Sequence, residues 1–130
     1  MVSLLSNSCV GAFVYKRLNL RYNNPLIGSL FLKDADWISF SKRPQYYLSL
    51  QPHICHPTDK FIHEVISPSY PVVILDDIRI DFIHEKPDKL YEKYMRRADR
   101  FANTEPYLVW SFSEMMSDHE NHQNIIDAFL

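Results

Sequence analysis

The chain has 130 residues and a formal net charge of -2, with hydrophobic residues at 46% and charged residues at 23%. This length fits one domain, the composition is typical of a globular protein, and the charge provides no basic field to hold nucleic acid. Because the chain has only two glycines, the glycine-rich phosphate-binding motifs are excluded.

The amino-terminal part of the chain predicts a strand, a polar turn and a helix. Val2 to Leu5 is a short apolar run, and Val10 to Leu18 follows a helical period. We expect Ser6, Asn7 or Ser8 to cap this helix, because their side chains accept hydrogen bonds from free N–H groups. One face of the helix carries Val10, Phe13, Val14 and Leu18.

The segment from Leu26 to Leu50 predicts an extended stretch and two helices. Leu26 to Leu32 is apolar enough for a strand or an extended buried segment. A helix starts with Asp34 as its cap, and Pro44 ends that helix or begins another over Gln45 to Leu50. The packing residues of the first helix are Trp37, Ile38 and Phe40.

A β-hairpin is predicted over residues 72–82. Val72 to Leu75 is an apolar run, Asp76 and Asp77 form a turn, and residues 78–82 alternate apolar and charged side chains. The preceding residues predict a loop over 51–59, a strand over 61–66 and a turn over 68–71.

The last part of the chain predicts a helix, a strand and a second helix. Pro87 and Asp88 open a helix that extends to residue 102, with an apolar stripe and a basic end. Tyr107 to Phe112 predicts a buried strand, and Ser117 with Glu120 forms a capping box for a helix to Leu130.

The order of these elements predicts where the polar turns meet. Residues 78–112 give a strand, a helix and a strand, so we expect a parallel, right-handed crossover with His84 and residues 111–114 at the same sheet edge. Residues 6–9 join that edge if the first strand is also parallel. The predicted fold is a single three-layer α/β domain over residues 1–130, with a mixed, partly parallel sheet and flanking helices.

Three parts of the sequence carry a family resemblance: Ser6 to Tyr15, Tyr22 to Gly28, and segments between Tyr70 and Arg97. The first two resemble the opening, and the third the middle block, of a bacterial family known as domain of unknown function 1919. The resemblance implies a setting in exopolysaccharide or capsule production and assigns no catalytic residue. The family domain runs past the end of this chain, and the apolar residues 128–130 also predict a missing C-terminal region or burial against a partner.

Cys9 is the candidate catalytic nucleophile. A thiol at a helix N-terminus favours the thiolate, and a nearby imidazole would activate it. A lone cysteine is more often a small buried hydrophobe, so this alternative stays open. Ser6, Asn7 and Ser8 are candidate substrate-binding residues that would hold a sugar or phosphate, unless they serve only as helix caps.

His84 is the candidate general base, since it ends the alternating strand at the sheet edge. A hydrogen-bonded histidine at the rim of the core is the alternative. Asn23 and Asn24 offer amides that suit sugar hydroxyls, although asparagine before proline is also a turn signal. Asp77 and Ser113 complete the candidate substrate-binding set.

Metal binding is not favoured. Two carboxylate pairs are explained by a helix cap and a turn, and a group of histidines with a cysteine lacks the spacing of structural zinc sites. These residues are Asp34, Asp36, Asp76, Asp77, His53, Cys55, His56 and His63. We expect no metal site, and the sequence identifies no cofactor.

The number of cysteines and the length of the apolar runs indicate the cellular compartment of the protein. Cys9 and Cys55 are too few for a disulfide framework, no signal peptide is present, and no apolar stretch has the length of a membrane span. We therefore expect a reduced, cytoplasmic protein, with peripheral contact to the inner membrane left open.

Two functions from different classes fit the sequence. The first is an enzyme of surface polysaccharide assembly, a glycosyl-, acyl- or phosphoryl-type transferase with Cys9 and His84 in its site. The second is a non-catalytic binding or scaffolding module of the same pathway, and a truncated inactive copy is a further alternative. Expected partners are a sugar or nucleotide sugar and a second copy or pathway protein, without nucleic acid or a transmembrane segment.

Overall fold

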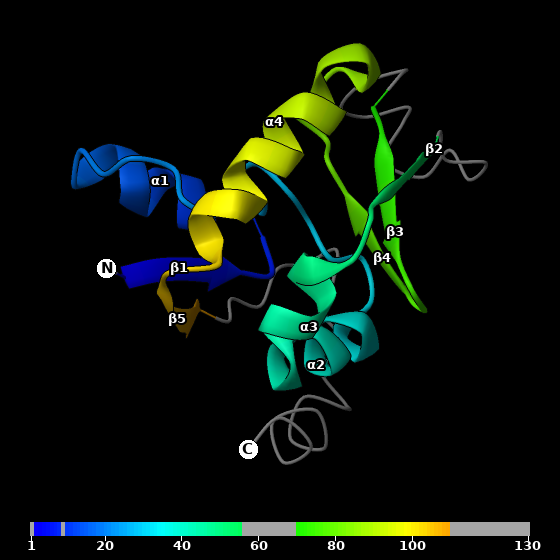
Figure 1. The fold of residues 1–130 in the computed structure, drawn as a ribbon, viewed down its shortest axis with the longest axis horizontal. Helices are drawn as coiled ribbons and strands as arrows, with labels where there is room; N and C mark the ends of the chain where they lie inside the picture. The colour runs from blue at the N-terminus through cyan, green and yellow to red at the C-terminus, as the bar shows by residue number, and fades with distance from the viewer. Residues whose placement is uncertain (1, 9, 56–69, 110–130) are drawn as a thin grey trace.

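The computed structural model describes residues 2–8, 10–55 and 70–109, which fold into helices and strands around a common core (Figure 1). The elements in chain order are β1 (Val2–Ser6), α1 (Val10–Arg17), α2 (Asp34–Lys42), α3 (Pro44–Ser49), β2 (His53–Cys55), β3 (Val72–Leu75), β4 (Ile78–Asp81), α4 (Pro87–Phe101) and β5 (Glu105–Val109). Helices combine with both parallel and antiparallel strand pairs, which confirms the predicted α/β class.

The antiparallel part of the fold is a three-stranded sheet in the order β2, β3, β4. β3 and β4 form the predicted hairpin, with Leu75 opposite Ile78, and Asp76 in the turn takes a positive φ of 56°. β2 lies within residues 51–59, so the prediction of a loop there is wrong. Pairing with β3 makes these three residues a strand, and no local pattern signals it.

The parallel part of the fold is the pair β1 and β5, with Val2 opposite Glu105 and Ser6 opposite Val109. The first and last described strands thus run parallel, which is the condition that the sequence analysis left open. β5 begins at Glu105, upstream of the predicted start at Tyr107.

α4 connects two different sheets, so the predicted parallel pairing of the strands around it is wrong. β4 pairs with β3 on one side, and on the other its Asp81 exchanges backbone hydrogen bonds of 2.8 and 2.9 Å with Leu30. Both edges of β4 are occupied at this point, and β5 pairs with β1 instead. Among the described residues the strands therefore form two sheets rather than one mixed sheet.

Helices form where the apolar periodicity predicts them, but the apolar face is not buried in every helix. α4 buries Leu90, Tyr94 and Phe101 as its apolar stripe predicts. α1 instead turns its apolar face to solvent, where Phe13 is 69% and Leu18 is 59% exposed.

The predicted start of α3 is confirmed, whereas the predicted cap of α2 is wrong. Pro44 begins α3, as expected from its fixed φ. Lys33 is the N-cap of α2 and Asp34 is its first helical residue, so the predicted Asp34 cap is wrong. α1 begins at Val10, directly after a residue outside the described ranges, so the predicted cap of this helix stays a prediction.

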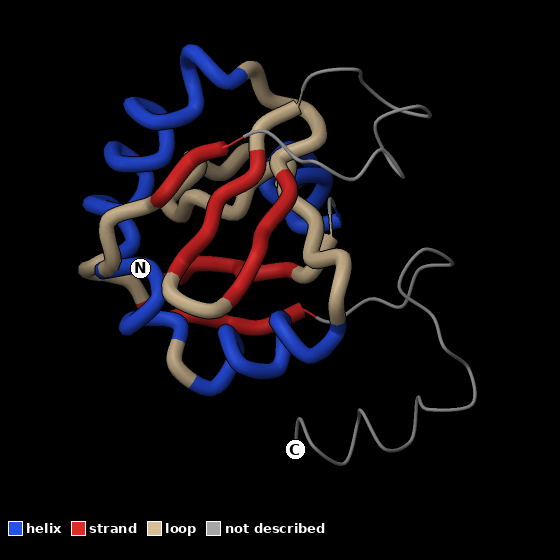
Figure 2. Tube along the Cα trace, turned by 90° about the vertical axis from the view of Figure 1, so that its right-hand side faces the viewer, coloured by secondary structure: helices blue, strands red, loops and turns tan. Residues whose placement is uncertain are grey.

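One hydrophobic cluster joins the two sheets. Leu5 of β1 packs in the same cluster as Val73 and Ile80 of the hairpin and the aromatic side chains of α2. Figure 1 shows α4 crossing from the antiparallel sheet towards β1 and β5, and Figure 2 shows the strands at the centre with helices around them. A smaller cluster around Leu30 and Val72 covers the opposite face of the hairpin.

Some predictions fall outside the described residues. They are the strand over 61–66, most of the turn over 68–71, the sheet edge over 111–114, Ser113 and the helix with its Ser117 and Glu120 capping box.

Candidate functional site

The turn after β1 is held tightly against α1. Ser6 and Asn7 are buried, and Ser8 is half-buried. The Ser8 backbone N–H donates to Ser6 Oγ at 3.2 Å. A Cβ at Gly11 would lie 3.1 Å from the Ser6 Cβ, a tight contact, so a larger residue there would push the first turn of α1 and β1 apart by a few tenths of an ångström.

A short segment, residues 28–31, lies between this turn and His84. The Phe31 backbone N–H donates to the Asn7 carbonyl at 3.0 Å, and Leu30 pairs with Asp81 near the end of β4. Gly28 has a φ of 75°, and a Cβ there would lie 3.9 Å from the His84 Cβ. Residues 6–8, residues 28–31 and His84 therefore form one continuous strip, called the His84 strip below.

His84 is exposed at one end of this strip, whereas most of the turn at the other end is covered. This exposure favours an imidazole accessible to solvent over a histidine at the rim of the core. Cys9 and Ser113 lie outside the described residues, so their candidate roles stay predictions.

Asn23 and Asn24 lie in a hydrogen-bonded cluster beneath β1. The Tyr15 hydroxyl donates to Asn23 Oδ1 at 2.5 Å and accepts from the Leu4 backbone N–H at 2.8 Å. Asn23 Nδ2 donates to the Val2 carbonyl at 2.8 Å. Asn24 Nδ2 is shared among Ser3 Oγ at 2.8 Å, the Leu4 carbonyl at 3.0 Å and the Tyr15 hydroxyl at 3.1 Å.

This group of Ser3, Tyr15, Asn23 and Asn24, called the Tyr15 cluster below, ties α1 and the following loop to β1. Asn24 Oδ1 also accepts from the Leu26 backbone N–H at 3.0 Å, so both amide groups are engaged by the chain itself. All four side chains are buried. The geometry therefore favours a structural role for the two asparagines over direct contact with a sugar.

Asp77 lies at the end of β4 opposite to His84. Its Oδ1 accepts from the Tyr47 hydroxyl at 3.2 Å, and Asp76 Oδ2 accepts from the Tyr46 hydroxyl at 3.1 Å. Burial and the Asp77 charge raise the pKa of Tyr47. The hairpin turn is thus anchored to α3, and the strand separates Asp77 from the His84 strip.

A buried ion pair that the sequence analysis did not single out lies on the outer face of β4. Asp81 is fully buried and binds Arg79 through two hydrogen bonds, Nε to Oδ1 at 2.8 Å and Nη2 to Oδ2 at 2.9 Å. The Tyr70 hydroxyl also donates to Asp81 Oδ2 at 3.0 Å. Arg79 and Asp81 are two residues apart in a strand, so their side chains lie on the same face. This spacing was the sequence signal that could have predicted the ion pair.

Asp36 of α2 forms a hydrogen bond with the backbone of β4. Its Oδ2 accepts from the Arg79 backbone N–H at 3.3 Å. Burial raises the pKa of Asp36 although this hydrogen bond and nearby cations lower it. Asp36 therefore acts as a structural acceptor, which differs from the metal-binding role considered for it.

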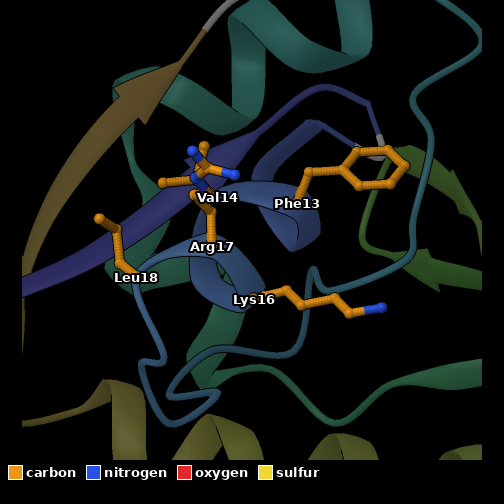
Figure 3. Close-up of a pocket in the computed structure, with 5 residues that line it drawn as sticks. All are labelled: Phe13, Val14, Lys16, Arg17 and Leu18. Atoms are coloured by element: carbon orange, nitrogen blue, oxygen red, sulfur yellow. The ribbon is translucent and has the colours of Figure 1, made fainter.

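A groove on α1 is a second candidate surface. Its volume is about 740 Å³. Figure 3 shows the lining side chains projecting from this one helix and the turn after it. They are Phe13, Val14, Lys16, Arg17 and Leu18.

Residues 2–8, 10–55 and 70–109 contain neither a metal-binding cluster nor a membrane-spanning helix. Within these ranges no group of three or more His, Cys, Asp or Glu side chains is arranged to hold a metal ion. The helices within the same ranges are too short or too polar to cross a membrane.

Comparison with known proteins finds a matching family model and a similar protein. Residues 1–129 match the family model described as "Domain of unknown function (DUF1919)". The chain is also 31% identical over 100 residues to an "Uncharacterized protein" of Haemophilus influenzae (strain ATCC 51907 / DSM 11121 / KW20 / Rd). This similarity covers 76% of the chain and 44% of the relative, so the chain spans less than half the length of that protein.

Proposed function

Because the chain belongs to the family described as Domain of unknown function (DUF1919), we propose that it acts on a sugar or an activated sugar in surface polysaccharide production. The family resemblance supplies the pathway in this proposal. The observation that carries the site is the His84 strip, in which the turn after β1 and an exposed imidazole flank the same segment, residues 28–31. The proposed compartment is the cytoplasm.

The chemistry of the strip suits transfer of a glycosyl, acyl or phosphoryl-type group. The turn leads into the N-terminus of α1, where free backbone N–H groups favour an anionic group such as the phosphate of an activated sugar. His84 would accept the proton of an attacking hydroxyl. Cys9, between the turn and α1, would serve as the nucleophile if the donor is first transferred to the protein.

A titration with nucleotide sugars tests this proposal. We expect UDP-glucose, UDP-N-acetylglucosamine or GDP-mannose to shift the amide NMR signals of residues 6–8, residues 28–31 and His84. The hairpin turn at Asp77 serves as the internal control, because it lies at the opposite end of β4. Shifts confined to other regions, or none with any member of the panel, would contradict the proposal.

A pair of substitutions tests catalysis. His84→Gln and Cys9→Ser are expected to abolish polysaccharide formation in cells without lowering the melting temperature of the protein. His53→Gln is the matched control, since His53 is an exposed histidine on β2. Normal product from both variants would exclude the catalytic role.

A non-catalytic scaffolding role is the second candidate. The exposed apolar face of α1 favours it, because such faces mark interaction sites. Under this role His84→Gln would leave the product unchanged, whereas Phe13→Ser would reduce it. The two functions therefore predict opposite outcomes for His84→Gln.

A further inference from the structure

α1 presents its apolar side chains outward although it is packed into the fold. Tyr15 points into the Tyr15 cluster and is 1% exposed, which fixes the inner face of the helix. The outer face carries Phe13 at 69% and Leu18 at 59% exposure, and Leu20 after the helix is 48% exposed. Phe13 and Leu18 line the groove of α1 (Figure 3).

Basic side chains are interleaved with these apolar ones. Lys16, Arg17 and Arg21 are all exposed, and residues 10–22 contain no aspartate or glutamate. The whole chain has a net charge of -2, so this positive surface is local. An anionic partner is therefore attracted to this face rather than to the molecule in general.

The positive surface continues onto the end of α4 through Tyr22. Arg100 Nη1 donates to the Tyr22 carbonyl at 2.9 Å, and the Arg97 guanidinium lies 4.9 Å from the centre of the Tyr22 ring. Burial and the neighbouring charges of Arg21 and Arg96 lower the pKa of Arg100. Cations from two separate segments of the chain thus gather beside α1.

We infer that the outer face of α1 docks on an anionic lipid bilayer. Phe13 and Leu18 enter the boundary between headgroups and acyl chains, and Lys16, Arg17 and Arg21 contact the lipid phosphates. Lys16, Arg17 and Arg21 lie beside exposed apolar side chains, and no carboxylate occurs in residues 10–22 to offset their charge. This combination of cations and apolar side chains complements the anionic headgroups and acyl chains of a bilayer.

Vesicle flotation tests this inference without any sugar, so its outcome is independent of the proposed function. The chain is expected to bind vesicles of equal parts phosphatidylglycerol and phosphatidylcholine, and not pure phosphatidylcholine. Raising the salt from about 0.1 M to about 1 M shortens the Debye length from about 10 Å to about 3 Å and should release the protein.

Paired variants assign the binding to α1. Lys16→Glu combined with Arg17→Glu should weaken binding by at least about 25-fold, since each basic residue near an anionic surface contributes about fivefold. Phe13→Ser should weaken it by about tenfold through lost apolar burial. Lys42→Glu on α2 and Tyr91→Ser on α4 are exposed controls and should bind normally.

Three outcomes would overturn the inference. The first is no binding to the anionic vesicles, and the second is binding that the α1 variants leave unchanged. The third is a dimer in solution that Phe13→Ser dissociates, which would assign the face to a second copy. Each α1 variant should also keep its melting temperature within about 4 °C, because a larger fall would mean that the chain itself buries this face.

Discussion

The two sheets of this molecule share one hydrophobic cluster through Leu5 of β1 but differ in how far each relies on apolar burial. In the antiparallel sheet Val73, Leu75 and Ile80 are 0% exposed and pack in the main hydrophobic cluster. In the parallel pair Val2 is 49% and Tyr107 is 51% exposed, and side chains of the Tyr15 cluster bind the β1 backbone.

This difference matters for the candidate site. Apolar burial is non-directional and stabilises the hairpin without fixing individual atoms, whereas hydrogen bonds specify geometry. The Tyr15 cluster binds the backbone of β1 at Val2 and Leu4, and the turn follows at the end of the same strand. The cluster therefore positions the amino-terminal end of the His84 strip, and the hairpin positions the other end.

The largest expected effect is in the antiparallel sheet. Ile80→Ala should lower the free energy of unfolding by about 3–4 kcal/mol, because it removes buried methyl groups and leaves a cavity. Urea denaturation measures this change, with Val2→Ala on β1 as the exposed control at about 0.5 kcal/mol or less. Equal losses from the two variants would contradict the comparison.

Tyr15→Phe tests the parallel pair. Removing the hydroxyl leaves Leu4, Asn23 and Asn24 without one buried hydrogen-bond partner each, and should cost about 2 kcal/mol. The same denaturation experiment measures it. A loss below about 0.5 kcal/mol would mean that the cluster contributes little net stability.

Tyr94→Phe is the matched control for Tyr15→Phe. Tyr94 is 1% exposed, and its hydroxyl has no hydrogen-bond partner among the described residues. Burial also raises its pKa. Removing this hydroxyl should be neutral or should stabilise the protein by about 1 kcal/mol, because an unpaired polar group leaves the core. A loss as large as that of Tyr15→Phe would contradict this assignment.

Sequence patterns predicted the hairpin and α4 because their periods extend over many residues. The apolar residues of α1 were also identified from the sequence. Which face of the helix is buried depended on Tyr15, whose hydroxyl meets its partners Ser3, Leu4, Asn23 and Asn24 only in the folded chain. β2 and the pairing of β5 with β1 were not predictable, since distant strands decide them.

The candidate site was predictable in part. A shared sheet edge was expected to bring the turn and His84 together, whereas in the structure each of them lies beside a different part of residues 28–31. Asn23 and Asn24 have the composition of a binding loop, and only their contacts identify them as parts of the fold.

The smallest expected effect is a pH dependence from Asp36. Its pKa is raised in the folded protein, so the folded state binds the proton more tightly than the unfolded one. Stability from this group is present below pH 3.8, the ordinary value, and is lost as the pH rises through the raised pKa. Thermal melts should therefore show Asp36→Asn gaining stability relative to the original chain towards neutral pH, whereas exposed Asp88→Asn should not. A difference that is constant with pH would contradict this.

Hydrogen exchange in the Tyr15→Phe variant tests the central comparison most directly. The Leu4 amide donates to the Tyr15 hydroxyl at 2.8 Å, so its protection and that of the other β1 amides should fall. Amides of β3 and β4 should keep their protection, because apolar packing stabilises that sheet. Equal loss in both sheets, or unchanged protection at Leu4, would contradict the account.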